Sequence, residues 1–412
     1  MDHEYEQDAA LLLQLFILSV GLLLCLPGEP RNPSFFEQRL AWKRYSEKHQ
    51  KRSTFTRRLR MGKDSFDKLL SFIVDDLLVN ETQAVRRGGS IIPALCLYCT
   101  LRYLAGGSYL DITDIAGISK SSFYRVLWKT ITAICKCPQL KIRFPNTGQE
   151  IKDAIDGFAG ISDGGAISNC VGVVDGYLMR IKVPTKKETG NIRSFFSGHY
   201  QCYGVNIQAV ADHHSRFIFF AYAAPGVSDD RNAMRQCALH GLVESLPAGA
   251  CVIGDAAYIP TERMVPIYQG TDKLIPLYDN FNFYASQCRI RVEMAFGIMQ
   301  MKWGILARPL GCSLKNMLWL AQAIARLHNF CINERLEAAG TVDNDTVLST
   351  NGTGYIPSVP HDADGDPVRL DNIFKGSFEG NSYLREFMAK RIKGLQLQRP
   401  SRNKKRRRRE DE

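Results

Sequence analysis

The stretch "GVVDGYLMRI", Gly172 to Ile181, has the composition of a strand that runs through a protein core, yet it carries Asp175 among its valines. Taking a carboxylate out of water costs several kcal/mol unless a partner compensates it. If Asp175 is buried, another part of the chain or a bound ion must therefore balance its charge.

The sequence around this stretch has the period of strands. The runs "CVGVVDGYLMRIKV", "YGVNIQAVADHHSRFIFFAYAAP" and "ACVIGDAAY" predict strands, and "HHSR" (His213 to Arg216) predicts a tight turn between two antiparallel strands. Helical runs follow the last two. Three antiparallel strands, a helix, another strand and further helices predict an α/β domain of the ribonuclease H-like kind, a mixed sheet with helices, over residues 166–336.

Two further acids stand at positions that are predicted to be buried. Asp255 ends the short apolar strand in "ACVIGDAAY", where the catalytic groups of α/β sheets gather. Glu293 lies in the helical run "SQCRIRVEMAFGIM" between Val292 and Met294, and is therefore expected on or near the buried side of that helix. Any one of the three acids alone would more readily be explained as a helix cap or an ion pair.

Three converging carboxylates would repel one another, and a divalent cation turns this repulsion into coordination. Hard oxygen ligands select Mg²⁺ or Mn²⁺. Two such ions can activate water and stabilise the leaving oxygen when a phosphodiester is cleaved. We therefore predict that Asp175, Asp255 and Glu293 are both the catalytic residues and the ligands of one or, more typically, two ions.

At these residues the sequence resembles the PIF/Harbinger transposases and their domesticated relatives, which are nucleases with a DDE triad on a ribonuclease H-like fold. The resemblance covers roughly Ser53 to Glu334. The stretches that carry it are "VVDGYLMRIKVP", "YGVNIQAVAD" with Asn206 and Gln208, "PGVSDDRN", "IGDAAYIP", "NFYASQCRIRVEMAFG" and "RLHNF" with His328 and Asn329.

Position by position, the resemblance implies the triad Asp175, Asp255 and Glu293. It also implies a supporting role around the site for Asp230. Arg289, one turn before Glu293, would orient that acid or contact a phosphate. His328 is expected to be a packed structural histidine.

The chain departs from the pattern of the family at two places near the predicted site. Ser197, Gly198 and His199 stand where relatives often have basic residues, and Gln300 stands where a lysine is frequent. The nearby "PTKKETGNIR" supplies three cations that would contact DNA instead: Lys186, Lys187 and Arg193.

The preceding region, residues 31–165, has the apolar spacing of helices. In "SYLDITDIAGISKSSFYRVLWKTITAI" one helix is expected to end at Gly117, and Ser119 is expected to cap the next. This is the layout of a helix-turn-helix, which would present Lys120 and Arg125, with Ser121, Ser122 and Tyr124, to DNA. The same pattern also occurs in ordinary helical bundles.

Charge and cysteine usage agree with a partner that is a polyanion. The chain has 53 Lys and Arg against 42 Asp and Glu, a net charge of +11. The stretch Trp42 to Lys63 is dense in cations with interspersed aromatics, which suits nucleic acid but also a solvated helix face. The scattered cysteines, including "CLYC" and "CKC", predict buried reduced thiols in an intracellular protein rather than a zinc site.

The two ends of the chain differ from its middle. Residues 1–30 are apolar, and "AALLLQLFILSVGLLLCLP" (Ala9 to Pro27) is either a helix packed on the body or a membrane anchor, since its flanks suit no signal peptide. Residues 337–412 are predicted to be a polar, largely disordered tail. Its basic run, Lys404 to Arg409, indicates a nuclear import signal or a nucleic-acid patch, and hence a protein of the nucleus.

The sequence thus favours a metal-dependent DNA endonuclease of transposase type, a hydrolase of phosphodiester bonds that could also join strands. The alternatives are a domesticated DNA-binding or adaptor protein that no longer cuts, and a ribonuclease H-like hydrolase of RNA. Expected partners are double-stranded DNA, a separate Myb-like DNA-binding protein and a second copy of the chain. The target sequence and the oligomeric state stay open.

Overall fold

The computed structural model describes residues 38–79, 90–340 and 382–400. The chain divides into two compact units, Met1–Arg39 and Leu40–Glu412, and every helix and strand named below belongs to the second. The apolar segment Ala9–Pro27 and the basic run Lys404–Arg409 lie outside the described residues, so the predictions made for them stay predictions. Within the described part, no helix combines the length and apolarity that crossing a bilayer requires.

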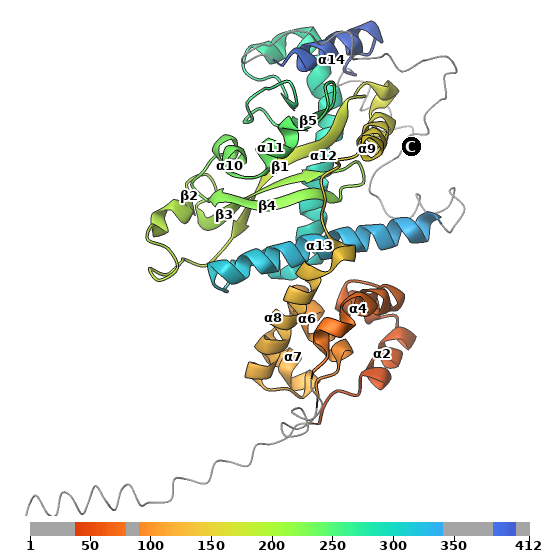
Figure 1. Ribbon diagram of the computed structural model, residues 1–412, viewed down its shortest axis with the longest axis vertical. Helices are drawn as coiled ribbons and strands as arrows, with labels where there is room; N and C mark the ends of the chain where they lie inside the picture. Colours follow the sequence, from red (N-terminus) through yellow and green to blue (C-terminus); the bar gives the residue numbers. More distant parts are fainter. Residues whose placement is uncertain (1–37, 80–89, 341–381, 401–412) are drawn as a thin grey trace, which may run out of the picture. The chain divides into compact units, whose positions relative to one another are not determined.

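A helical region comes first in the described chain (Figure 1). Its core contains Phe66 and Tyr98, which are fully buried, and the ring of Trp42 stacks on Phe66 at 4.9 Å. Its helices are α2 (Trp42–Lys51), α3 (Phe55–Leu59), α4 (Lys63–Leu77), α6 (Pro93–Leu104), α7 (Tyr109–Ala116) and α8 (Lys120–Lys136). Cys96 and Cys99 are buried on α6, as expected for packed thiols.

The turn between α7 and α8 has the local structure that the sequence predicts. Gly117 ends α7 in the left-handed conformation, with φ 62°. The Ser119 side chain accepts a hydrogen bond from the Ser122 amide and caps α8. Phe123 and Leu127 are buried, which leaves Lys120 and Arg125 exposed at the start of α8.

The second region is built on a mixed sheet of six strands among the described residues, in the order β2-β3-β1-β5-β6 with β4 also paired to β3. β1 and β4 are antiparallel to β3, and β5 and β6 continue parallel to β1. The strands are β1 (Cys170–Arg180), β2 (Phe196–Ser197), β3 (Cys202–Ala211), β4 (Phe217–Pro225), β5 (Cys251–Gly254) and β6 (Met264–Pro266). The predicted turn at His213 to Arg216 therefore joins β3 to β4.

Helices cover both faces of the sheet, because neighbouring residues of β1 point to opposite sides. Val173 packs into a core that includes residues of α12 and α13, while Val174 packs with residues of α9, α10 and α11. The helices are α9 (Gly148–Ile161), α10 (Asp230–Gln236), α11 (Leu239–Glu244), α12 (Pro276–Lys302) and α13 (Leu314–Gly340). Single-turn 3₁₀ helices lie at Pro138–Leu140, Asp163–Gly165, Ile192–Phe195, Asp272–Leu274 and Gly304–Ala307.

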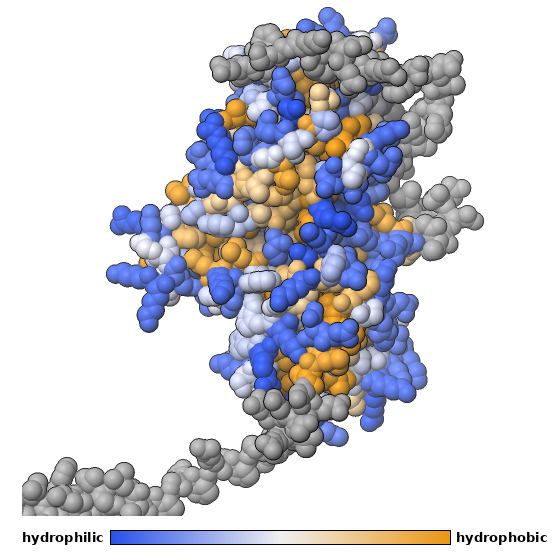
Figure 2. Space-filling view, in the orientation of Figure 1, coloured by the Kyte–Doolittle hydropathy of each residue, from blue (hydrophilic) through white to orange (hydrophobic). Residues whose placement is uncertain are grey.

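The predicted fold class is thereby confirmed: a mixed α/β domain with a curled sheet, consistent with the ribonuclease H-like fold, and a helical region before it. Figure 2 shows hydrophilic residues distributed over the viewed face, with apolar residues between them.

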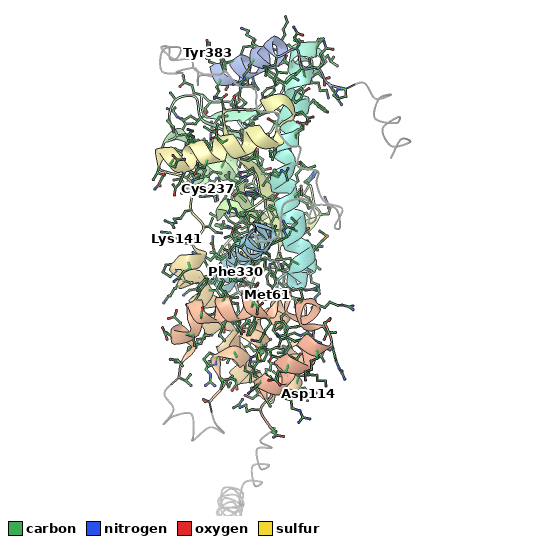
Figure 3. All side chains as sticks on the ribbon, turned by 90° about the vertical axis from the view of Figure 1, so that its right-hand side faces the viewer. Met61, Asp114, Lys141, Cys237, Phe330 and Tyr383 are labelled. Carbon is green, nitrogen blue, oxygen red and sulfur yellow. The ribbon has the colours of Figure 1, made fainter. Side chains whose placement is uncertain are left out.

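Helix α13 contacts both regions (Figure 1). On one side the Gln322 amide donates to the Phe220 carbonyl of β4 at 2.6 Å. On the other side Phe330 meets Phe72 of α4 edge-on, with ring centres 6.3 Å apart, and Lys68 of α4 pairs with Glu334 at 2.7 Å. Figure 3 labels Phe330 at this junction. The helical region and the sheet therefore share one packed helix.

The segment predicted as a polar tail contains one further described helix, α14 (Tyr383–Gly394), so the expectation of a largely disordered tail does not hold at this place. Leu384, Met388 and Ile392 are buried, and α14 contacts α12. Their four-residue spacing is the apolar stripe of a packed helix. The stripe is visible in the sequence but is only three turns long.

Candidate active site

Asp175 lies at the centre of β1, on the sheet face that α12 covers. Tyr177, two residues on and hence on the same face, stacks on Phe296 of α12 with ring centres 5.0 Å apart. One oxygen of Asp175 accepts the amide of Gly176 at 2.8 Å. Burial raises the pKa of Asp175 to about 7, the Gly176 bond and the charge of Arg289 oppose the rise, and Asp255 and Asp230 add to it.

Asp255 is brought to Asp175 by the register of two parallel strands. Val173 of β1 pairs with Ile253 of β5, so two residues further along both strands Asp175 and Asp255 stand at the same level. Adjacent strands are about 4.8 Å apart. The Oδ1 atom of Asp255 accepts the Ala257 amide at 3.0 Å, which fixes this carboxylate at the end of β5.

Asp230 lies on the other face of β1. A Cβ atom on Gly176 would stand 1.8 Å from Asp230 Oδ1, so only glycine leaves room for this carboxylate. The same oxygen accepts hydrogen bonds from the amides of Asn206 at 2.9 Å and Gln208 at 3.0 Å. The Tyr258 hydroxyl in turn donates to the Gln208 carbonyl oxygen at 2.7 Å. Asp230 is thus held by a polar network on the face opposite to Asp175.

This network assigns a role to Asn206, Gln208 and Tyr258, which the sequence alone does not. Asn206 and Gln208 belong to the family-like motif, but the sequence does not show that they hold Asp230. Burial raises the pKa of Asp230, its bonds to the two amides lower it, and the charge of Asp255 raises it further. Tyr258 could have been found from the motif "IGDAAY", because a buried tyrosine hydroxyl needs a hydrogen-bond partner.

Glu293 is exposed, so the expectation that it lies on the buried side of its helix is wrong. Val292 is fully buried in α12, and one residue on the helix has turned by about 100°. Glu293 accepts a hydrogen bond from Arg289 at 2.7 Å, and the two side chains are 52% and 16% exposed. The triad position is therefore paired with the arginine predicted to orient it.

The stripe of α12 that carries Glu293 follows β1. Arg289 acts on the pKa of Asp175, Phe296 stacks on Tyr177, and Gln300 donates a hydrogen bond to the Tyr177 hydroxyl at 2.9 Å. Positions 289, 293, 296 and 300 share one face of a helix. Gln300 stands where the resemblance predicts a lysine, and its side chain is hydrogen-bonded to Tyr177 of β1.

The acids fit a divalent cation by their chemistry. Within the described ranges, the second oxygens of Asp175 and Asp255 accept no hydrogen bond, and no Lys or Arg forms an ion pair with either residue. The buried Nε of Arg289 also lacks a hydrogen-bond partner there. Hard carboxylate oxygens without a cation of their own suit Mg²⁺ or Mn²⁺. In the described part, however, no three acidic, His or Cys side chains converge as a complete set of ligands.

Of the residues expected to contact DNA, all five cations and Ser121 are exposed, whereas Ser122 and Tyr124 are half-buried. Lys120 lies 5.4 Å from the ring centre of Tyr109, and Arg125 donates to the Ser122 hydroxyl at 3.3 Å, both at the start of α8. Lys186, Lys187 and Arg193 follow β1 in the segment that leads to β2.

His328, expected to be structural, is fully buried on α13. Its Nε2 lies 2.8 Å from the Ser215 carbonyl oxygen. Burial lowers the pKa of His328 to about 4, and its bond to Ser215 opposes this shift. A neutral, enclosed imidazole next to a backbone carbonyl serves packing, since no reacting group can reach it.

Comparison with known protein families gives a match for the sheet region. Residues 174–329 match the family model of the DDE superfamily endonucleases, and the matched range begins one residue before Asp175 and includes Asp255 and Glu293. Members of this superfamily generally use divalent metal ions. No curated protein and no solved structure matches the chain. The chain thus contains a domain of the DDE endonuclease type, which suggests a transposase-type nuclease acting on DNA.

Proposed function

We propose that this protein is a metal-dependent DNA endonuclease of the PIF/Harbinger transposase type. The observation that carries the proposal is the pair Asp175 and Asp255: the register of β1 and β5 brings them to neighbouring positions, and within the described residues neither forms an ion pair with Lys or Arg. The match of residues 174–329 to DDE endonucleases supports the same reaction class.

In this proposal each acid has its own part. Asp175 and Asp255 hold the divalent ions, which when bound activate water and stabilise the leaving oxygen. Glu293 turns from Arg289 toward the site, completes it and accepts the proton of the attacking water. Arg289 is then free to contact a phosphate. Asp230 keeps Asn206 and Gln208 in place behind the strand.

The substrate in this proposal is double-stranded DNA. Lys120 and Arg125 contact it through the helix-turn-helix, and Lys186, Lys187 and Arg193 contact it close to the strand that bears Asp175. A Myb-like partner and a second copy of the chain would add target specificity and bring two DNA ends together. The basic run at the C-terminus would direct the protein to the nucleus.

The second candidate function is that of a DNA-binding or adaptor protein that does not cut. One observation favours it: Glu293 is half-exposed and paired with Arg289, and within the described residues it does not converge with the two aspartates as a set of metal ligands. A protein that only binds DNA needs no metal. Binding of Mg²⁺ therefore separates the two functions.

The test is a nicking assay on supercoiled DNA with Mg²⁺ or Mn²⁺, combined with thermal melting in EDTA and in excess Mg²⁺. We expect cleavage by the parent and none by Asp175→Asn, Asp255→Asn or Glu293→Gln. Asp156→Asn, at an exposed position of α9, is the matched control and should cut normally. Mg²⁺ should raise the melting temperature of the parent and of Asp156→Asn, and leave that of the three site variants unchanged. DNA binding without cleavage or a metal effect would establish the non-cutting alternative, and binding of RNA alone would exclude both.

A further inference from the structure

A cavity of about 600 Å³ lies away from the acids, at the meeting of the helical region and the end of β1. Its walls come from α6, α7 and α8 on one side and from the segment after α12 on the other. Aromatic side chains of Tyr103, Tyr109 and Trp128 line it, with Leu320 of α13. The cavity has the size and the apolar lining of a site for an organic group.

Two exposed cations, Lys182 and Arg308, complete the lining of this cavity. Both are held by backbone contacts, since the Lys182 amide donates to the Leu310 carbonyl at 3.0 Å and the Arg308 side chain donates to the Gly106 carbonyl at 3.4 Å. Within the described residues neither cation forms an ion pair. The cavity therefore offers flat apolar surfaces beside two uncompensated positive charges.

The aromatic wall continues to the helix-turn-helix. Trp128 lies on α8 two turns after Lys120, and Tyr124 between them approaches Tyr109 with ring centres 5.8 Å apart. Lys120 in turn lies 5.4 Å from the centre of the Tyr109 ring. One face of α8 thus leads from the exposed cation at its start into the cavity.

The distance between the cavity and Asp175 can be estimated along β1. Lys182 follows Asp175 by seven residues, which an extended chain spans in about 23 Å. At 3.4 Å per step, this is about seven nucleotides of a DNA strand. A DNA strand whose phosphate lies at Asp175 would therefore reach the cavity about seven nucleotides further on, and α8 lies at the wall of that cavity.

We propose that this cavity binds one unpaired nucleotide of the DNA, with its base against Tyr103, Tyr109 and Trp128 and its phosphate at Lys182 and Arg308. Bases stack on aromatic rings regardless of sequence, and guanidinium and ammonium groups bind phosphate. The site holds the strand between the helix-turn-helix and the acids. This inference rests on the proposed DNA substrate and adds to it a contact that requires a base outside the duplex.

The experiment compares two short duplexes that differ at one central position. One is fully paired, and in the other a base faces an abasic site, so that less energy is needed to move it out of the stack. The full-length parent should bind the second duplex about tenfold more tightly, a gain typical of one stacked base. Trp128→Leu should bind both duplexes equally, whereas Trp128→Phe should keep the preference because it keeps an aromatic face.

Trp319→Leu is the matched control, because Trp319 is a half-exposed tryptophan on α13 that does not line the cavity. It should behave as the parent does. Lys182→Gln and Arg308→Gln should each lower the salt dependence of binding by about one counterion. Melting curves show whether each variant is folded, and the Phe variant keeps the test valid if Trp128→Leu is unstable.

Each outcome decides a different point. If the parent binds DNA but shows no preference for the unpaired base, or if Trp128→Leu keeps it, the cavity inference fails and the proposed nuclease stands. If deoxyadenosine monophosphate binds the parent through Trp128 while DNA binding is independent of this residue, the site serves a free nucleotide and the inference also fails. If the parent binds no DNA at all, the proposed function itself fails.

Discussion

Two aspartates of the sheet region, Asp175 and Asp212, differ in the partners that compensate their carboxylates. Asp212 follows β3 and is 4% exposed. It accepts hydrogen bonds from the amides of His214 and Arg216 and from the Arg216 side chain, the last at 2.6 Å. Arg216 is held in turn by Asn333 at 3.1 Å.

Asp175 has no such partners. It accepts one amide, from Gly176; the charge of Arg289 favours its ionised form, whereas Asp255 and Asp230 disfavour it. A buried carboxylate therefore says little by itself, because most are satisfied by their own chain as Asp212 is. What marks Asp175 is that Arg289 favours its ionised form without forming an ion pair with it in the described chain, and we propose that a metal ion would supply the remaining positive charge.

The largest expected difference between the two concerns cleavage. Asp175→Asn removes a charged ligand, and loss of several kcal/mol of stabilisation by the metal should slow nicking of supercoiled DNA about a thousandfold or more. Asp212→Asn should cleave at nearly the parent rate per folded molecule. Equal cleavage rates for the two variants would show that Asp175 has no catalytic role that Asp212 lacks.

Stability should show the opposite order. Asp212→Ala leaves the amides of His214 and Arg216 and the Arg216 side chain without their acceptor, and should lower the free energy of unfolding by about 3 kcal/mol. Asp175→Asn in EDTA should be as stable as the parent or more stable, because repulsion is relieved. Urea denaturation of the variants measures this, and a destabilised Asp175→Asn would mean that the backbone, not an ion, satisfies Asp175.

The environment of Asp175 can also be disturbed from its opposite face. Gly176→Ala pushes a methyl group into Asp230 and should cost about 2 kcal/mol, typical of overpacking. Gly160→Ala is the control, because its Cβ meets nothing within 4 Å and should stabilise α9 by up to about 1 kcal/mol. If Asp230→Ser combined with Gly176→Ala restores stability, the clash is the cause, and if the cost persists another contact is responsible.

The smallest effect concerns pH in the absence of metal. The folded-state pKa of Asp175, about 7, lies above its usual value of 3.8, so its contribution is fully present below about pH 4 and is lost as the pH rises through 7. Between pH 5.5 and pH 7 the parent in EDTA should lose about 1–2 kcal/mol relative to Asp175→Asn. Parallel pH dependences for the two proteins would show that Asp175 is ionised at no cost.

Elements with strong local signals were predictable from the sequence. Gly117 and Ser119 define the turn between α7 and α8 by their own conformational preferences, and alternation defines β1, β3 and β4. In these cases the information lies within a few residues. The convergence of Asp255 with Asp175 was an expectation of the resemblance, because the sequence shows each acid on a strand but not which strands are neighbours.

The rest depends on contacts that are distant in sequence. That Asp230 stands behind β1 follows from its contact with Gly176, which depends on the position of α10 against the sheet. The exposure of Glu293 depends on the rotation of α12, which its flanking Val292 and Met294 do not define. The short α14 is stabilised by packing on α12, as a helix of this length is marginal alone.

Because α13 packs against both the helical region and the sheet, the two regions cannot be separated without exposing one side of this helix. A cut between residues 165 and 166, where the sequence changes from helices to strands, would separate α4 and α8 from Phe330 and the acidic end of α13. A catalytic fragment made in this way would expose an apolar flank and tend to aggregate. A chimera that exchanged the helical part or the sheet with that of another protein would therefore have to carry a matching α13.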